Sequence, residues 1–310
     1  MRIGIDAMGG DFAPEVVVEG ALQALELLDA HSKIVLFGNK EQIEGLLPPN
    51  CPIEIVPTTQ VITMSDHPAQ AFQSKTDSSI TVGFSHLSSG RIDGFASAGS
   101  TGAMMVGSMF LIKAITGVAR PTIATHFTST AGTPVTLLDV GLNSDCKPEV
   151  LAQYGVMGSI YASQVCGINN PRVALLNIGS EDTKGNLVSK STFPLLKACS
   201  AINFVGNVEG KHILDATVAD VIVCDGFVGN VLIKLLESLY DTLHPEGVDL
   251  PYINSMNYET IGGTPVLGIN STVIIGHGAS SAMAICNMIL ATQKTIAADL
   301  VTKFKAAFGA

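Results

Sequence analysis

Short apolar runs rich in β-branched residues alternate with longer amphipathic stretches along the whole chain. Residues 173–178 form such a run between Pro171 and Gly179, which predicts a buried strand. In residues 17–28, apolar side chains recur at three- and four-residue spacing, and this period predicts an amphipathic helix. Regular alternation of strands and helices favours an α/β protein with a mainly parallel sheet that helices cover on both faces.

The same reasoning extends to the rest of the chain. Further strands are predicted at residues 2–6, 34–37, 53–56, 93–98, 122–125, 135–140 and 273–275, and the pair 122–125 and 135–140 resembles a hairpin or two adjacent strands. Further helices are predicted at residues 40–47, 78–87, 103–114, 147–165, 191–200, 227–243 and 280–308. Residues 244–264 are rich in proline and glycine and are expected to form an irregular excursion. Because no linker is evident, we expect a single domain over residues 1–310.

Three apolar runs, at residues 173–178, 202–210 and 221–230, open into turns with a glycine-asparagine pair. The pairs are Gly185-Asn186 (preceded by Lys184), Gly206-Asn207 and Gly229-Asn230. A lysine beside a glycine at the carboxyl end of a strand has the form of an anion site in an α/β protein. The three pairs therefore indicate one shared pocket, although glycines that only make tight turns would give the same pattern.

A second strand–glycine–helix joint lies within residues 93–114. Ser100, Thr101 and Gly102 would place two hydroxyls and free backbone N–H groups at the amino end of a helix, which suits phosphate. Ordinary capping of that helix by Ser100 explains the same residues. His277 stands between two glycines after an apolar run, so it either reaches a pocket or caps the last helix.

Other candidate side chains have plainer explanations. Asp6 and Asp11 flank the first glycine turn, where two carboxylates can bind a metal, but helix capping and turn formation are favoured. Cys224 lies beside Asp225 with no histidine near it in sequence, so a buried structural thiol is favoured over a nucleophile. The six cysteines show neither C-x-x-C spacing nor histidines at ligand spacing, and we therefore predict no metal site and no disulfide framework.

Composition and motif searches exclude several classes of protein. The chain is 47% hydrophobic, but no apolar run reaches the roughly 18 residues of a membrane-spanning helix. No basic and apolar leader precedes the first strand, so we expect a cytoplasmic protein. A net charge of −10 disfavours nucleic acid as a partner. No G-x-G-x-x-G follows the first strand, and residues 206–211 (GNVEGK) are one residue too short for a P-loop.

Several separated motifs together resemble the PlsX family of phosphate acyltransferases. They are IDAMGGDFAP (residues 5–14), SAGSTGAMM (97–105), LLDVGLNSDCKPEVLAQYGVMG (137–158), LLNIGSEDTKGN (175–186), FVGNVEG (204–210), VCDGFVGN (223–230) and GGTPVLGIN (262–270). The motifs extend over most of the chain and are highly specific when they are taken together.

The resemblance implies an activity and a fold. The family transfers a long-chain acyl group from acyl carrier protein to inorganic phosphate, and a membrane acyltransferase then uses the acyl phosphate in phospholipid synthesis. The implied fold is a three-layer α/β/α sandwich, similar to isocitrate and isopropylmalate dehydrogenases and to phosphotransacetylase. It would form a homodimer and need neither a metal nor a nucleotide cofactor. The resemblance places the protein in the cytoplasm, with peripheral contact at the inner membrane face as a further option.

Two departures from the family pattern concern partners. Before GGTPVLGIN the family usually carries a longer helical excursion with apolar and basic residues, and here that segment is short. No Lys or Arg occurs at residues 235–293, so this segment lacks the clustered cations that anionic lipid attracts. Of the basic cluster that tends to precede the Asp-Ser-Ser motif only Lys75 remains, which weakens the case for a contact with the carrier protein there.

For this reaction we expect phosphate to attack the thioester directly, without a covalent enzyme intermediate. Lys184 is the predicted cation that fixes phosphate, and Asn230 is the predicted amide donor to the thioester oxygen. Backbone N–H groups at Ser100, Thr101 and Gly102 would cradle phosphate. The further candidates for substrate binding are Asn186, Asn207, Gly229 and His277.

Three alternatives remain open from the sequence. A phosphotransacetylase-like enzyme would use acyl-CoA, and assays with different acyl donors would separate it from the first hypothesis. A metal-dependent dehydrogenase of the same fold needs clustered aspartates and a nucleotide site, and the sequence offers neither. A non-catalytic module that binds acyl carrier protein is disfavoured because Lys184 and Asn230 are present.

Overall fold

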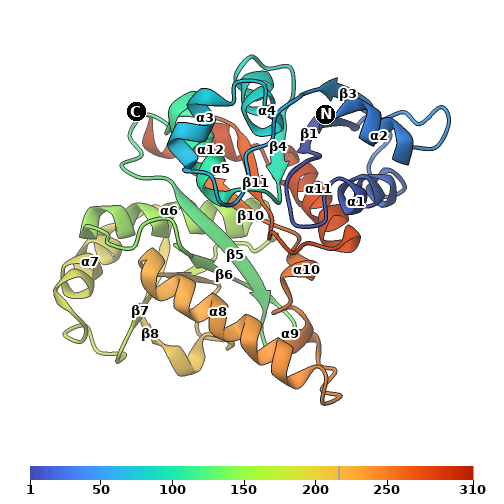
Figure 1. Cartoon of the computed structure of the whole chain (residues 1–310). Coiled ribbons are helices and arrows are strands. Elements are labelled where there is room, and N and C mark those ends of the chain that lie inside the picture. The colour runs from blue at the N-terminus through green and yellow to red at the C-terminus, as the bar shows by residue number, and fades with distance from the viewer. Residues whose placement is uncertain (216, 310) are drawn as a thin grey trace. The chain divides into compact units, whose positions relative to one another are not determined.

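The computed structural model describes residues 1–215 and 217–309 (Figure 1). These residues form two compact units. The first unit contains residues 1–114 and 258–301, and the second contains residues 115–257 with the C-terminal residues from Thr302. Each unit has its own part of a mainly parallel sheet with helices around it, which confirms the predicted α/β class. The organisation as a single domain stays a prediction.

The strands of the first unit are ordered β3-β2-β1-β4-β11-β10, and they are parallel apart from β10, which runs antiparallel to β11. They are β1 (Arg2–Asp6), β2 (Lys33–Gly38), β3 (Glu54–Pro57), β4 (Gly94–Ser97), β10 (Thr264–Leu267) and β11 (Thr272–Ile275). The helices are α1 (Glu15–Leu25), α2 (Lys40–Leu46), α3 (Pro68–Ser74), α4 (Ser79–Ser88), α5 (Thr101–Gly107), α10 (Tyr258–Ile261) and α11 (Ala282–Ala297), with the π-helix η1 (Ser108–Ile112) after α5.

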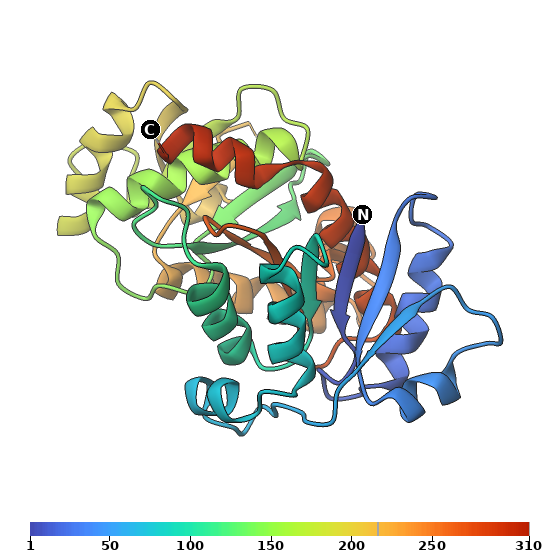
Figure 2. The ribbon, with the colours of Figure 1, turned by 90° about the horizontal axis from the view of Figure 1, so that it is seen from above.

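Apolar residues between the sheet, α1 and α11 form the core of the first unit. Ile5 of β1, Val17 of α1 and Ile289 of α11 are buried in this cluster. Gly20 allows α1 and α11 to approach closely, because a Cβ atom at this position would lie 2.5 Å from the carbonyl oxygen of Ala282. The two helices accordingly lie side by side (Figures 1 and 2).

Two helices that the sequence predicts as continuous are interrupted. The helix expected at residues 280–308 is divided into α11 and α12 (Leu300–Phe308), because Asp299 between them adopts a left-handed conformation with a φ of 48°. The helix expected at residues 103–114 starts earlier, as α5, and changes at Ser108 into the π-helix η1. Both predictions of a single helix are therefore wrong.

Asp6 ends β1 as a buried carboxylate. Its Oδ2 accepts a hydrogen bond from the Ser97 hydroxyl at 2.6 Å, and its Oδ1 accepts one from the Met8 backbone N–H at 3.0 Å. These bonds give Asp6 the turn-forming role favoured from the sequence. The expected helix capping is wrong, because Pro14 is the N-cap of α1 and no side chain caps this helix. Burial raises the pKa of Asp6 above its ordinary value, because desolvation disfavours the charged carboxylate.

We expect the Asp6→Asn variant to gain stability relative to the wild type as the pH rises. A carboxyl whose pKa is raised by folding contributes stability below its unfolded pKa of 3.8, and this contribution is lost as the pH rises through the folded value. The two free energies of unfolding in urea, measured from about pH 4 to about pH 8, should diverge by at most about 1.4 kcal/mol per pH unit. A difference that stays constant over this range would contradict the effect of burial.

The strands of the second unit are ordered β5-β6-β9-β7-β8. The strands β5 (Thr122–Thr128) and β6 (Pro134–Leu138) are antiparallel, which confirms the predicted pair, and the other neighbours are parallel. The remaining strands are β7 (Arg172–Asn177), β8 (Asn203–Glu209) and β9 (Val221–Val223). The helices are α6 (Pro148–Gln164), α7 (Leu187–Ala198), α8 (Gly226–Leu243) and α9 (Pro251–Asn254), with the 3-10 helix η2 (Gly210–His212). Residues 244–264, expected to be irregular, contain the short helices α9 and α10.

Helix α6 packs on β6, β7 and β9, where its Tyr154 and Met157 are fully buried. Helix α7 follows β7 after a loop, and α8 follows β9 directly. Because β7 and β9 are parallel neighbours, their carboxyl ends bring the amino ends of α7 and α8 to the same edge of this sheet. This edge carries Lys184 and Asn230.

Candidate active site

The loop of residues 178–186, which follows β7, carries Lys184. The Asn177 side chain closes this loop, because its Oδ1 accepts from the Ile178 N–H at 2.8 Å and its Nδ2 donates to the Lys184 carbonyl oxygen at 3.2 Å. The Lys184 side chain is exposed, and within the described ranges its ammonium group has neither an ion pair nor a hydrogen bond. This lysine is therefore available to an anionic ligand.

Asn207 and Asn186 hold the two sides of this loop. From β8, Asn207 donates its Nδ2 to the Glu181 carbonyl oxygen at 2.9 Å, and its side chain is largely buried. Asn186 caps α7, because its Oδ1 accepts from the Ser189 N–H at 2.8 Å and from the Ser189 hydroxyl at 3.0 Å. Both asparagines position the loop of Lys184, and their contact with substrate stays a prediction.

The prediction that all three glycine-asparagine pairs form turns after strands is wrong. Gly185-Asn186 does lie in a turn, directly before α7. Gly206-Asn207 instead lies inside β8, and Gly229-Asn230 lies inside α8. Residue 178, predicted as the end of a buried strand, lies beyond β7, and the Ile178 side chain is 80% exposed.

The amino end of α8 is built on Asp139, an aspartate to which sequence reasoning assigned no role. Asp139 is fully buried, and its carboxylate accepts from the Leu142 N–H at 3.1 Å and from the Asn143 N–H at 2.7 Å and Nδ2 at 2.9 Å. The Asn143 carbonyl oxygen in turn accepts from the Gly226 N–H at 2.7 Å. The signal was present in the LLDVGLN motif, where an aspartate and an asparagine directly follow an apolar run.

Asn230 projects from α8 toward the segment that follows β6. Its Nδ2 lies 3.5 Å from the Val140 carbonyl oxygen, at the long limit of a hydrogen bond, and the residue is exposed. Gly229 beside it has a packing role, because a Cβ atom at this position would overlap the carbonyl oxygen of Asp139. The amide of Asn230 is therefore weakly held and able to donate to a ligand, whereas Gly229 is explained without one.

Cys224 is a structural thiol at this edge of the sheet. Its Sγ lies 3.4 Å from the Asp139 carbonyl oxygen, to which it donates. Burial raises the pKa of the Cys224 thiol well above its ordinary value, and the nearby carboxylates of Asp225 and Asp139 add to this shift. A thiol that stays protonated is a poor nucleophile, which agrees with the interpretation favoured from the sequence.

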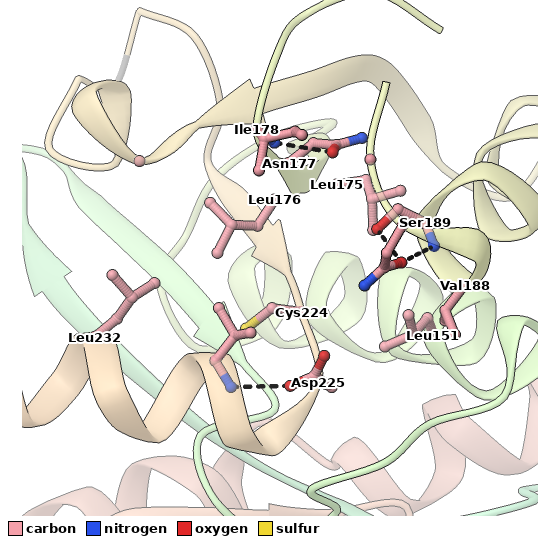
Figure 3. Close-up of a pocket in the computed structure, with 14 residues that line it drawn as sticks. Leu151, Leu175, Leu176, Asn177, Ile178, Val188, Ser189, Cys224, Asp225 and Leu232 are labelled. Atoms are coloured by element: carbon pink, nitrogen blue, oxygen red, sulfur yellow. Dashed lines mark hydrogen bonds between the residues drawn. The ribbon is translucent and has the colours of Figure 1, made fainter. Parts of the chain in front are cut away.

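A cavity of about 560 Å³ opens between β7, α6, α7, α8 and the residues that follow β9 (Figure 3). Apolar side chains form most of its wall: Leu151, Leu175, Leu176, Ile178, Val188, Val228 and Leu232, together with Cys224. Gly185 and Asn186, which follow Lys184 in sequence, lie at its wall as well. The cavity is therefore continuous with the loop that carries the predicted catalytic lysine.

The remaining candidates lie in the first unit. Ser100 caps α5, since its Oγ accepts from the Ala103 N–H at 3.3 Å, and Thr101 beside it is exposed. Gly102 faces Pro68, whose ring a Cβ atom at residue 102 would meet. A phosphate cradle at Ser100, Thr101 and Gly102 stays a prediction beside this capping role.

His277 lies in the turn that follows β11. Its ring stacks on that of Tyr258 with 4.4 Å between the centroids, and its Nδ1 accepts from the Ala279 N–H at 3.2 Å. Ser281 caps α11, so the suggestion that His277 caps this helix is wrong. His277 is exposed, and its contact with substrate stays a prediction.

Lys75, the basic residue that remains before the Asp-Ser-Ser motif, is engaged within the first unit. Its Nζ lies 2.6 Å from Oδ2 of Asp66 and donates to the Val61 carbonyl oxygen at 2.9 Å. The hydrogen bond from Lys75 is the main reason that the pKa of Asp66 is lowered to about 2. Lys75 therefore stabilises residues 61–75 and does not present an unpaired cation to a carrier protein.

The comparisons with known proteins concern the family and the fold of the whole chain. A sequence profile described as "Fatty acid synthesis protein" matches residues 1–245. The phosphate acyltransferase of Desulfitobacterium hafniense is 42% identical over 327 aligned positions, which cover 98% of this chain and 97% of that protein. The chain belongs to the phosphate acyltransferase family. It is therefore an acyltransferase enzyme, and phosphate is the substrate that this family implies.

Two solved structures share the fold of this phosphate acyltransferase. A phosphotransacetylase from Streptococcus pyogenes superposes with a TM-score of 0.68 and 17% identity, covering 95% of this chain and 94% of that one. A branched-chain phosphotransacylase from Enterococcus faecalis superposes with a TM-score of 0.66 and 14% identity, covering 96% of this chain and 99% of that one. At these identities the likeness shows the fold alone, and it confirms the phosphotransacetylase-like fold that the sequence motifs implied.

Neither a membrane span nor a metal cluster is found in the described part of this phosphate acyltransferase. No helix there is long and apolar enough to cross a membrane. The same residues contain no group of three or more His, Cys, Asp and Glu side chains that could hold a metal ion.

Proposed function

We propose that this phosphate acyltransferase moves a long-chain acyl group from acyl carrier protein to inorganic phosphate, and that the acyl phosphate serves phospholipid synthesis. The observation that carries the proposal is the state of Lys184. Its ammonium group is exposed and has no partner among the described residues, while Asn177 and Asn207 hold the surrounding loop. A fixed loop with an unpaired cation is suited to hold phosphate next to an acyl donor.

In the proposed reaction, a phosphate oxygen attacks the carbonyl carbon of the thioester directly. Lys184 holds the phosphate and offsets its negative charge, and the Asn230 amide donates to the oxyanion that develops on the carbonyl oxygen. The carbonyl then re-forms, the carbon–sulfur bond breaks, and the thiolate of the donor leaves. Phosphate is itself the nucleophile in this route, so no acyl-cysteine intermediate is formed, and the Cys224 thiol is buried and donates to the Asp139 carbonyl oxygen.

The partners of this reaction belong to the same proposal. Acyl carrier protein supplies the acyl group, and a membrane acyltransferase accepts the acyl phosphate that is formed. We further propose a homodimer in the cytoplasm that works at the inner face of the membrane. The family membership of the chain supports these partners by analogy.

The test is the formation of acyl phosphate from palmitoyl-acyl carrier protein and inorganic phosphate, trapped as hydroxamate, with palmitoyl-CoA assayed in parallel. We expect product that depends on phosphate and that forms faster from the carrier-protein thioester. Product from CoA thioesters alone would replace the proposal by phosphotransacetylase-like chemistry. Absence of product from both donors, with carrier protein still bound, would favour a non-catalytic binding module.

A further inference from the structure

The cavity next to the Lys184 loop has an apolar and uncharged interior. Leu151 of α6, Leu175 of β7 and Cys224 are buried at 3%, 1% and 5% exposure, so they form its deep wall. In Figure 3 the side chains of Leu176 and Leu232 extend into the same space from β7 and α8. The cavity therefore offers a ligand a long stretch of aliphatic surface that is removed from water.

The charges around the cavity exclude an anion from its interior. None of the residues that line it, all within the described ranges, is a lysine, arginine or histidine. Its one carboxylate belongs to Asp225, whose Oδ1 accepts from the Val228 N–H at 2.8 Å as the cap of α8. A phosphate placed among these groups would lose its hydration without gaining a cation.

Polar groups gather instead where the cavity meets the loop of Lys184. Asn177, Gly185, Asn186 and Ser189 lie on this side, and the Asn186 and Ser189 side chains bond to each other. Ile178 and Val228 also line the cavity, although their side chains are 80% and 37% exposed. An apolar ligand that enters beside them would cover both side chains and leave its polar end near Lys184.

We infer that this cavity binds the hydrocarbon chain of the acyl donor, with the thioester at the side of Gly185 and Asn186. The inference rests on the proposed function, which names acyl carrier protein as the donor of a long acyl chain. It adds the place where that chain binds, which the proposed reaction does not specify. Burial of each additional methylene group should tighten binding by about fourfold until the cavity is filled. Leu176 and Leu232 are then residues that limit the length of chain that fits.

The inference is tested by narrowing the cavity with Leu176→Phe and Leu232→Phe. Both positions line the cavity, are half-buried and lie on different elements, so a larger side chain at either one should reduce the space for a hydrocarbon chain. Leu195→Phe is the matched control, because Leu195 is 39% exposed on α7 and does not line the cavity. The thermal unfolding midpoint of each variant, followed by circular dichroism, shows that it is folded.

The first measurement is kcat/KM for palmitoyl and octanoyl thioesters of acyl carrier protein. We expect the palmitoyl-to-octanoyl ratio to fall by about tenfold or more in both test variants, in line with the loss of two or more buried methylene groups, and to stay unchanged in Leu195→Phe. Unchanged ratios in both test variants, with acyl phosphate still being made, would overturn the inference and leave the proposed function standing.

The second measurement does not require turnover. Palmitate is titrated against a fluorescent fatty-acid probe, cis-parinaric acid, on the wild type and the three variants. We expect both test variants to bind palmitate at least tenfold more weakly than the wild type and Leu195→Phe to bind it equally well. Weaker palmitate binding by both test variants, without acyl phosphate formation by the wild type, would overturn the proposed function alone. Equal palmitate binding by all four proteins would overturn the chain-binding site.

Discussion

Replacing Lys184 with alanine is expected to lower the rate of acyl phosphate formation by about a hundredfold or more, which is the typical effect of losing one preorganised charge-stabilising group. The loop itself should survive the change. Its hydrogen bonds from Asn177 and Asn207 end on the backbone carbonyl oxygens of Lys184 and Glu181, and none of them uses the lysine side chain. The loss should therefore be confined to chemistry and phosphate binding.

Lys190→Ala is the matched control for this prediction. Lys190 is also exposed, lies on α7 only six residues further along, and has no side-chain partner among residues 1–215 and 217–309. Initial rates are measured against phosphate concentration for both variants and for the wild type. Near-normal turnover in Lys184→Ala would contradict the catalytic role of Lys184. An equal loss of turnover in Lys190→Ala would also contradict it and would point to a general effect of net charge.

The sequence predicted strands well because apolar runs bounded by proline and glycine are a local signal. The run at residues 173–178 corresponds to β7, with an error at its end. The strand ends at Asn177 because that side chain accepts the hydrogen bond of the Ile178 N–H, which a sheet neighbour would otherwise receive. A hydrogen bond between a side chain and the neighbouring backbone N–H cannot be predicted from the pattern of apolar residues.

The glycine-asparagine pairs show where local reasoning fails. The same two residues form a turn before α7, part of strand β8 and part of helix α8. Partners that are distant in sequence decide between these outcomes, such as Glu181 for Asn207 and Asp139 for Gly229. The loop after β7 was nevertheless placed beside a pocket, since Gly185 and Asn186 line the cavity, because a position after a buried strand depends on the sheet edge and not on the exact turn. The catalytic role of Lys184 stays a prediction.

Gly229→Ala is expected to destabilise the protein by about 3 kcal/mol or more, which is the upper part of the range for overpacking. A Cβ atom at this position would overlap the Asp139 carbonyl oxygen and lie 2.9 Å from the Asp139 carbonyl carbon and 3.1 Å from Cys224 Sγ. Backbone atoms cannot rotate away as a flexible side chain can. The amino end of α8 would therefore move off the segment after β6, and Asn230 would move with it.

Gly45→Ala is the control for this prediction, because Gly45 lies in α2 and a Cβ atom there meets nothing within 4 Å. That variant should gain about 0.5–1 kcal/mol, since alanine loses less conformational freedom than glycine when a helix forms. Urea unfolding followed by circular dichroism compares the two variants with the wild type. If Gly229 served only to bind substrate, Gly229→Ala would unfold at the wild-type midpoint and bind phosphate more weakly. A lowered midpoint would show instead that this glycine is required for α8 to pack against the Asp139 carbonyl group.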